Sequence, residues 1–253
     1  HTLETLKCTP IPFIPSRISD GYGLNSRMIE DINNQNIKLI VTVDNGISAV
    51  EAIDLATEYN IDVILTDHHT IPSEPPKVFA LVHPETTEQN SGYRELAGVG
   101  LAYILATELY KSLNIRPKDN FIKDLFCIGT IADMALVKRV NRSLLKEHMP
   151  LLSKSKILGL SFLINGSGLK NRTITSQDIG FKIAPKINAV GRLDDPSLIL
   201  KLFLEKDAKE AQRLALECHK LNDRRRILVE GIVEEAIALY ESDYTENIHF
   251  ILL

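Results

Sequence analysis

The chain has 253 residues, of which 44% are hydrophobic and 25% are charged, and its formal net charge is −4 at pH 7. These values are typical of a globular protein with one large domain or two smaller ones. The acidic balance argues against a strongly basic nucleic-acid-binding protein, but it does not exclude a nuclease, because bound metal ions can offset a nuclease's own carboxylates.

The first third of the chain alternates between strand-like and helix-like patterns. Helices are expected at 24–34 and 48–59, where apolar residues recur on one face. Strands are expected where short apolar runs stand between turn residues, at 11–16, 38–43, 61–66 and 79–82. Strands that alternate with helices through short turns indicate βαβ units, so the sequence predicts an α/β fold with a parallel sheet and flanking helices.

After Gly98 the pattern becomes helical. Helices are expected at 99–113, 120–131, 144–152, 157–164, 176–183 and 197–204. The first two are apolar on more than one side, which is typical of helices inside a core. Thr175 precedes the fifth helix and Asp178 lies in its first turn, and both residue types suit a helix start.

Residues 207–241 contain no proline and a single glycine, Gly231, while apolar residues recur at helical spacing. They predict one amphipathic helix of about 35 residues, longer than most helices within domains. A helix of this length often links two domains. We therefore expect an α/β domain at 1–150, its helical continuation at 151–205, a linking helix at 206–242 and the first strand of a second domain at 243–253.

The cysteines and the chain ends bear on the cellular setting. Cys8, Cys127 and Cys218 form neither a zinc-ligand spacing nor a disulfide framework, so we expect a reducing, cytoplasmic environment. No run of about 18 apolar residues occurs, so no membrane span is expected. The chain starts with neither an initiator methionine nor a signal peptide and ends in the apolar run 249–253, so both ends look cut from a longer protein.

Polar side chains follow two neighbouring strands of the predicted sheet. The run Asp67-His68-His69 follows the strand at 61–66, and Asp44 ends the strand before it. The carboxyl ends of parallel strands open on the same edge of a sheet, so these side chains are expected to meet in a ligand-binding crevice. Taken alone, Asp44 could equally belong to a turn that caps the next helix, whereas two adjacent imidazoles after an acid are harder to explain by packing.

A cluster of carboxylates and imidazoles suits divalent metal ions. Two such ions about 3.5–4 Å apart can bind both the attacking and the leaving oxygen of a phosphoryl transfer, and imidazole favours Mn2+ over Mg2+. His68 is expected to bind one ion through one ring nitrogen, while Asp67 holds the other nitrogen of that ring. His69 is then free to contact a phosphate oxygen or to transfer a proton. A third acid, Asp133, leaves the helix at 120–131 and could join this cluster or simply face water.

These motifs resemble those of the DHH phosphoesterase family. Asp67-His68-His69 matches the motif that names the family, the stretch 43–47 matches the second family motif, and 129–133 matches the fourth. Four further stretches are similar to one branch of that family, the bacterial exonucleases specific for single-stranded DNA, at 14–17, 21–25, 185–193 and 221–226. The resemblance runs from Pro12 to the end of the chain.

The resemblance implies a set of site residues. Asp44 would bridge two Mn2+ or Mg2+ ions, with His68 and Asp133 as further ligands, and His69 and Asp67 would be catalytic at the scissile phosphate. Nucleic acid would be bound by Arg17, Asn188, Arg192, Arg224 and Arg225. From position alone, Arg17 and Arg192 could instead form surface ion pairs, and the run 224–226 could be a solvated helix face.

The resemblance also implies an activity and partners. The activity would be 5′→3′ hydrolysis of phosphodiester bonds in single-stranded DNA during recombination and repair, by a monomer, with a helicase and a single-strand-binding protein as further partners. The alternatives are another DHH phosphoesterase, acting on short RNA, cyclic dinucleotides or pyrophosphate, and a non-catalytic DNA-binding scaffold.

The chain departs from the family pattern in two places. The first family motif, an Asp-x-Asp strand end, and the Gly-Gly-His motif of the second domain do not occur in it. We therefore expect an internal piece of a longer enzyme, with a metal site that lacks some of its ligands.

Overall fold

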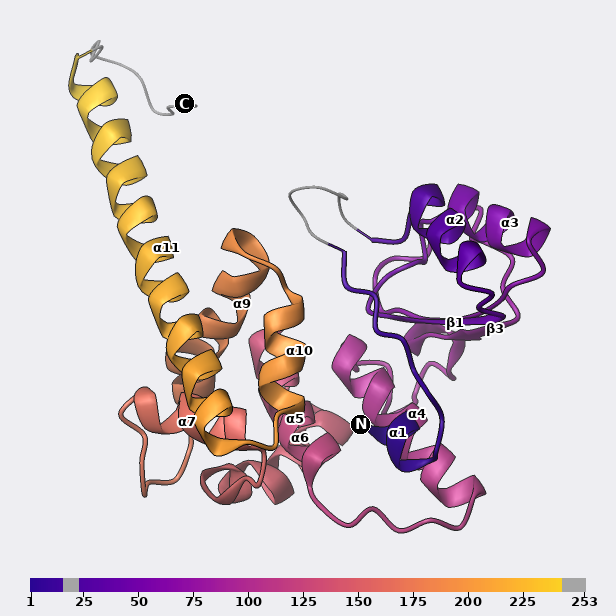
Figure 1. Ribbon diagram of the computed structural model, residues 1–253, viewed down its shortest axis with the longest axis horizontal. Helices are drawn as coiled ribbons and strands as arrows, with labels where there is room; N and C mark the ends of the chain where they lie inside the picture. Colours follow the sequence, from indigo (N-terminus) through magenta and orange to yellow (C-terminus); the bar gives the residue numbers. More distant parts are fainter. Residues whose placement is uncertain (16–22, 243–253) are drawn as a thin grey trace.

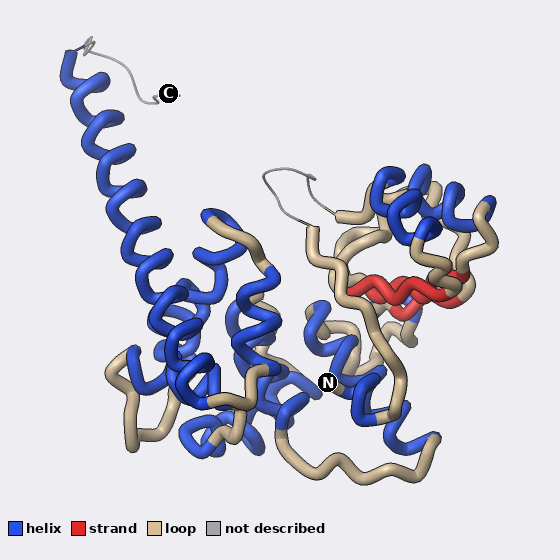
Figure 2. Tube along the Cα trace, viewed as in Figure 1, coloured by secondary structure: helices blue, strands red, loops and turns tan. Residues whose placement is uncertain are grey.

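The structure is a computed structural model that describes residues 1–15 and 23–242. Its strands lie together at one end of the molecule, and helices make up most of the rest (Figure 2). Among these described residues, none of the helices has the length and apolar character needed to cross a bilayer. Cys127 and Cys218 are buried, Cys8 is exposed, and all three are free thiols.

The sheet is parallel and three-stranded, with its strands side by side in chain order. Figure 1 shows it nearly edge-on. These strands are β1 (Leu39–Val43), β2 (Asp62–Thr66) and β3 (Ala80–Val82). In the register of the sheet, the last residues of all three are neighbours, since Val43 pairs with Thr66 and Thr66 with Val82. The prediction that the strand ends meet at one edge is therefore confirmed.

Helices cover the sheet on both sides, as the sequence predicts. Figure 1 shows α2 (Ser26–Asn34) and α3 (Val50–Glu58) on one side and α4 (Gly98–Ser112) on the other. The core between the first two helices and the sheet contains Ile29, Ile53 and Leu65, all fully buried.

The remaining elements are helical and surround a second core. The longer ones are α5 (Phe121–Ala132), α6 (Arg139–His148), α7 (Leu158–Gly166), α9 (Ala184–Leu193), α10 (Ser197–Leu204) and α11 (Ala208–Ser242). The short ones are α1 (Thr2–Thr5), the 3-10 turns η1 (Pro84–Thr86) and η2 (Met149–Lys154), α8 (Ser176–Asp178) and the π-helix η3 (Ile179–Ile183). Phe126, Leu152 and Leu160 are fully buried between them.

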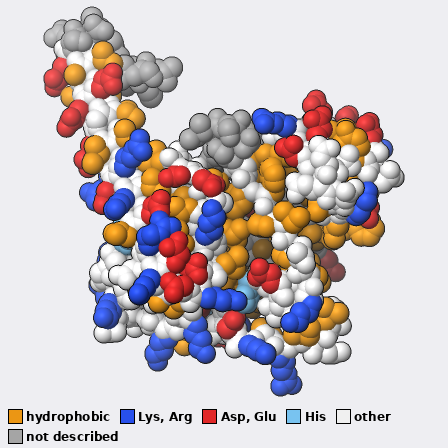
Figure 3. All heavy atoms as spheres, viewed as in Figure 1, with side chains coloured by type: hydrophobic (Ala, Val, Ile, Leu, Met, Phe, Trp, Pro, Cys, Tyr) orange, Lys and Arg blue, Asp and Glu red, His pale blue; other side chains and the backbone are white. Residues whose placement is uncertain are grey.

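The long helix α11 confirms the prediction of one continuous helix. Its first half packs against α7 and α9 and buries Leu214, Cys218 and Leu221. Its second half projects from the rest of the molecule and exposes apolar side chains such as Ile227 and Ile232 among charged ones (Figures 1 and 3). That it links two domains remains a prediction, and the strand expected at 243–253 lies outside the described residues.

Two sequence predictions differ from the structure. Residues 11–15 form no strand, because Pro10, Pro12 and Pro15 remove backbone N–H donors that a sheet would need. The helix expected at 176–183 starts as predicted, with a capping box in which Thr175 and Asp178 bond each other's backbone N–H groups. It then widens into η3 before Pro185, which has no N–H to donate to the preceding turn, and continues as α9.

A pair of glycine substitutions tests the packing of the helical part. Gly159 on α7 lies against Leu202 on α10, and a Cβ there would overlap both the backbone carbonyl oxygen and the side chain of Leu202. We expect Gly159→Ala to lower the free energy of unfolding by about 1–3 kcal/mol, measured by urea denaturation followed by circular dichroism.

Gly231→Ala is the matched control, because nothing lies within 4 Å of a Cβ at this position of α11. Removing a helical glycine there should leave the stability unchanged or raise it by up to about 1 kcal/mol. Equal effects of the two substitutions would contradict the close approach of α7 and α10.

Candidate metal centre

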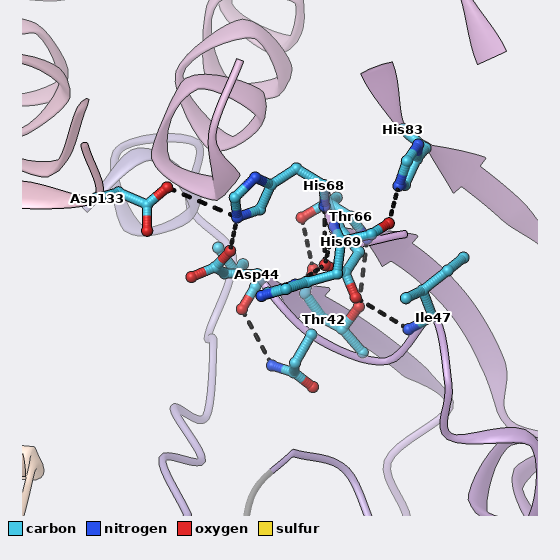
Figure 4. A network of polar contacts seen from close by, with 11 residues as sticks. Thr42, Asp44, Ile47, Thr66, His68, His69, His83 and Asp133 are labelled. Atoms are coloured by element: carbon cyan, nitrogen blue, oxygen red, sulfur yellow. Dashed lines mark hydrogen bonds and ion pairs between the residues drawn. The ribbon is translucent and has the colours of Figure 1, made fainter. Parts of the chain in front are cut away.

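Asp44 stands at the carboxyl end of β1, where the chain turns sharply. Its backbone is left-handed, with φ +64°, a conformation that aspartate tolerates better than most residues. The Asp44 N–H donates to the carbonyl of Thr66 at 2.9 Å, which joins the ends of β1 and β2. The next residue holds the turn, since Asn45 Nδ2 donates to the carbonyl of Val43 at 3.0 Å. The turn thus fixes the Asp44 carboxylate beside the residues that follow β2 (Figure 4).

His68 lies between two carboxylates that come from different parts of the chain. Its Nε2 is 2.9 Å from Oδ1 of Asp44 and 3.7 Å from Oδ2 of Asp133 (Figure 4). Nε2 of His68 and Oδ1 of Asp44 are both buried, and neither makes a hydrogen bond to a described residue, because the two atoms are close without being aligned as donor and acceptor. Two polar atoms that face the same point without bonding each other fit a shared cation.

The electrostatics of the cluster also fit a cation. Burial raises the pKa of the Asp44 carboxyl, and the nearby carboxylate of Asp133 raises it further, although His68 acts in the opposite direction. One ligand atom each from Asp44, His68 and His69 can be chosen so that all three lie within 4.8 Å of one another. Carboxylate oxygens and imidazole nitrogens together suit divalent ions such as Mn2+.

Asp67 is buried, and it supports His69 rather than His68. Its Oδ1 is 2.6 Å from Nδ1 of His69 and accepts the backbone N–H groups of His68 and His69, while its Oδ2 accepts the N–H of Ile47 at 3.0 Å. The prediction that Asp67 holds the second nitrogen of His68 is wrong, because the Asp67 carboxylate bonds the ring of His69 and backbone N–H groups. The His68 ring instead points towards Asp44 and Asp133 (Figure 4).

These bonds set the charge of both partners. Burial alone would raise the pKa of Asp67, but the hydrogen bonds from Ile47, His69 and His68 outweigh it and lower the pKa. The same side-chain bond raises the pKa of His69, partly against the effect of burial. Because Nδ1 of His69 is bonded to Asp67, Nε2 is the ring nitrogen that can contact a ligand in the cleft.

Helix packing brings Asp133 to the cluster. Asp133 is the C-cap of α5. This helix packs closely on α4, because Gly129 of α5 leaves room for Val99 of α4. A Cβ at Gly129 would lie only 2.8 Å from the Val99 side chain. The start of α4 in turn approaches Asp44 at Gly98, where any Cβ would overlap the Asp44 carboxylate. Sequence reasoning missed the role of Gly98, although a glycine at the start of a core helix was its signal.

The cluster opens into a cleft that also receives α9. The cleft has a volume of about 610 Å3, and its lining includes Asp44, His69 and Asp133 together with Asn188 and Arg192 of α9. The side chains of both α9 residues are exposed. Within residues 1–15 and 23–242, Arg192 forms no ion pair, so a surface ion pair does not explain it.

Two other predicted nucleic-acid-binding residues, Arg224 and Arg225, are not brought to this cleft. Arg224 is exposed on α11, and Arg225 is half-buried with an Nε that makes no hydrogen bond to a described residue. Neither lines the cleft. Arg17 lies outside the described residues. The roles of these three arginines remain predictions.

One buried residue next to the cluster escaped the sequence reasoning. His83 follows β3, the third strand that ends at this edge, and its Nε2 lies 2.8 Å from the backbone carbonyl of His69. Its Nδ1 accepts the N–H of Glu85 at 3.1 Å. The signal was a histidine directly after a short apolar strand, a position similar to that of the other two histidines.

Comparisons with known proteins agree with this geometry. The model of the DHH family, N-terminal domain, matches residues 3–130. The single-stranded-DNA-specific exonuclease RecJ of Bacillus subtilis is 38% identical over 241 residues, which is 95% of this chain and 30% of the relative. The chain thus spans about a third of the length of that protein, and 44% of the RecJ of Escherichia coli, to which it is 33% identical over 94% of its own length.

Solved structures show the same arrangement of elements. The crystal structure of an exonuclease RecJ bound to manganese matches 92% of this chain, and 59% of its own, with a TM-score of 0.84 and 35% identity. The structure of RecJ from Thermus thermophilus in complex with Mn2+ matches 92% of this chain and 33% of its own, with a TM-score of 0.80 and 32% identity.

The ligand cluster can be tested on the 253-residue chain itself. We expect this chain to bind Mn2+ weakly, because its cluster contains few carboxylates, and we expect Asp44→Asn to reduce the affinity by about tenfold or more. Isothermal titration calorimetry with Mn2+ measures both.

Gly98→Ala should act in the same direction as Asp44→Asn, because the added Cβ displaces the Asp44 carboxylate. Asp54→Asn, which removes an acid from α3 outside the cluster, is the control and should leave the affinity unchanged. Undiminished Mn2+ binding by both Asp44→Asn and Gly98→Ala would rule out this cluster as the metal centre.

Proposed function

The chain belongs to the DHH family, as its motifs predicted, and we propose that it is part of a metal-dependent exonuclease that hydrolyses the phosphodiester bonds of single-stranded DNA. One observation carries this proposal: Asp44 and Asp133, which flank His68, line the same cleft as His69, Asn188 and Arg192. Metal ligands and phosphate-binding groups in one cleft are what a phosphodiester hydrolase needs. The names of the RecJ relatives support the same activity.

We infer that Asp44, His68 and Asp133 hold divalent ions, with Mn2+ as the first choice and Mg2+ as the second. Bound ions would supply positive charge to the attacking and leaving oxygens of the phosphodiester. The unbonded pair formed by Asp44 Oδ1 and His68 Nε2 supports this assignment, and so do the titles of RecJ structures that contain Mn2+ and Mg2+.

His69 is proposed to act directly on the scissile phosphate. Asp67 fixes the His69 ring through Nδ1, so Nε2 is free to donate a hydrogen bond to a phosphate oxygen or to transfer a proton. Asp67 is fully buried and does not itself reach the cleft, so we revise its predicted role to that of a residue that positions and charges His69.

The substrate is proposed to lie along α9. Asn188 can donate or accept a hydrogen bond, and the Arg192 guanidinium can bind a phosphate in a bidentate manner. Gly191 lies between them, and nothing is within 4 Å of the position that a Cβ would take there. The backbone is therefore accessible to a strand of DNA. The 5′→3′ polarity, the monomeric state and the helicase and single-strand-binding-protein partners remain predictions from the family resemblance.

The activity should be tested on the full-length protein that contains this chain. We expect Mn2+-dependent release of nucleotides from the 5′ end of long single-stranded DNA, and we expect Asp44→Ala and His68→Ala to abolish it while circular dichroism and unfolding stay unchanged. His69→Ala should lower kcat by about 10²–10⁴-fold.

The choice of substrate separates the alternatives. Rapid hydrolysis of dinucleotides or pyrophosphate with little effect on long strands would instead identify another phosphoesterase of the family. DNA binding without any hydrolysis would identify a scaffold. Asp54→Ala is the control and should be as active as the wild type.

Arg192 gives a second, independent prediction. If its guanidinium binds one phosphate of a single strand, Arg192→Ala should reduce the slope of log Kd against log salt concentration by about 0.7. Arg192→Lys should keep the salt slope but bind less tightly, because the bidentate contact is lost. Arg213→Ala is the control, since Arg213 is an exposed arginine of α11 that pairs with Glu210. A slope that does not change in Arg192→Ala would remove this residue from the DNA path.

A further inference from the structure

His83 is a buried polar residue beside the candidate metal centre, and the mechanism proposed above does not use it. It is 2% exposed and stands directly after β3, at the start of η1. Both ring nitrogens have partners: Nδ1 is 3.1 Å from the backbone nitrogen of Glu85, and Nε2 is 2.8 Å from the backbone oxygen of His69 (Figure 4).

The two partners fix the tautomer of the ring. A backbone N–H can only donate, so Nδ1 of His83 must be the unprotonated acceptor. A carbonyl oxygen can only accept, so Nε2 must carry the proton. His83 is therefore held as a neutral imidazole that joins the start of η1 to the backbone of His69.

His69 is consequently held at three points. Its ring is bonded through Nδ1 to Asp67 at 2.6 Å, its N–H donates to the same carboxylate at 3.2 Å, and its carbonyl accepts from His83. The first two bonds do not involve the His69 carbonyl. The third bond holds that carbonyl, and it comes from the residue that follows β3.

We propose that His83 is a positioning residue for His69, acting through the hydrogen bond from Nε2–H to the His69 carbonyl. The proposal rests on the proposed function, in which His69 contacts the scissile phosphate. A misplacement of about 1 Å at a reacting group can be costly to the rate, so a single bond to this carbonyl affects turnover without changing the metal ligands.

A purely structural role for His83 is the alternative. Its Nδ1 caps η1, and Thr86 Oγ1 donates to the His83 carbonyl at 2.7 Å, so the residue also stabilises the turn. The two roles use different ring atoms, and they can be separated because each atom has a counterpart in an amide side chain. The Oδ1 of asparagine lies as far from Cβ as Nδ1 of histidine, whereas the Nε2 of glutamine reaches as far as Nε2 of histidine.

Two substitutions in the full-length protein therefore have opposite expected results. His83→Asn keeps the cap on η1 and loses the bond to His69, so stability should stay close to that of the wild type while kcat on single-stranded DNA falls fivefold or more. His83→Gln keeps the bond to His69 and loses the cap, so it should lower the unfolding temperature and keep most of kcat. KM and Mn2+ affinity should be unchanged in both, because within the described residues no hydrogen bond or ion pair joins His83 to Asp44, His68 or Arg192.

The outcomes distinguish the possible failures. If the wild-type protein lacks nuclease activity, the proposed function fails, and the positioning role, which rests on it, fails with it. If the wild type is active and kcat falls with stability in both variants, or if His83→Asn keeps full kcat, the positioning role is overturned. Loss of Mn2+ binding in His83→Asn would also overturn it, since the effect would then act through the metal ligands.

Discussion

Thr42 and Thr66 are bonded to each other where β1 and β2 end, and the candidate site depends on this pairing. Thr66 Oγ1 donates to the carbonyl of Thr42 at 2.8 Å, and the Thr66 N–H donates to Thr42 Oγ1 at 3.2 Å, both in a buried position. These bonds add to the ordinary ladder and oppose a slip of one strand along the other. A slip of one residue would turn every side chain of the strand to the opposite face, so Asp44 and His68 would no longer meet.

The acids at this edge divide into two kinds. Asp67 has a 1% exposed side chain, and both of its oxygens accept hydrogen bonds from the protein, so its charge serves the fold and His69. The side chains of Asp44 and Asp133 are 46% and 43% exposed, and Oδ1 of Asp44 has no hydrogen-bond donor among the described residues. A carboxylate saturated by N–H groups is a poor ligand, whereas one with an unused oxygen is available to a cation. Burial and bonding thus distinguish Asp67, the proposed positioning acid, from Asp44 and Asp133, the proposed metal ligands.

Much of this site follows from the sequence. The parts that were predicted wrongly or missed have two physical reasons. Asp44 and His68 were predicted together because the ends of parallel strands share an edge, which is a property of topology. The partner of Asp67 was predicted wrongly, because side chains alternate along an extended chain and Asp67 therefore shares its side with His69, two residues on, and not with its neighbour His68. Gly98 and His83 were missed because their importance arises from close approach between segments. Such approaches depend on tertiary packing, which spacing along a chain does not encode.

The face of β1 turned away from α2 and α3 adds a last constraint. Its alternate residues Leu39, Val41 and Val43 are 49%, 36% and 48% exposed, and within the described residues the outer edge of β1 has no partner strand. An apolar strand with an open edge invites a further strand. A parallel strand there would end beside Asp44, which is where the family resemblance predicts the Asp-x-Asp motif. Ligands on such a strand would approach Asp44 from the side opposite β2.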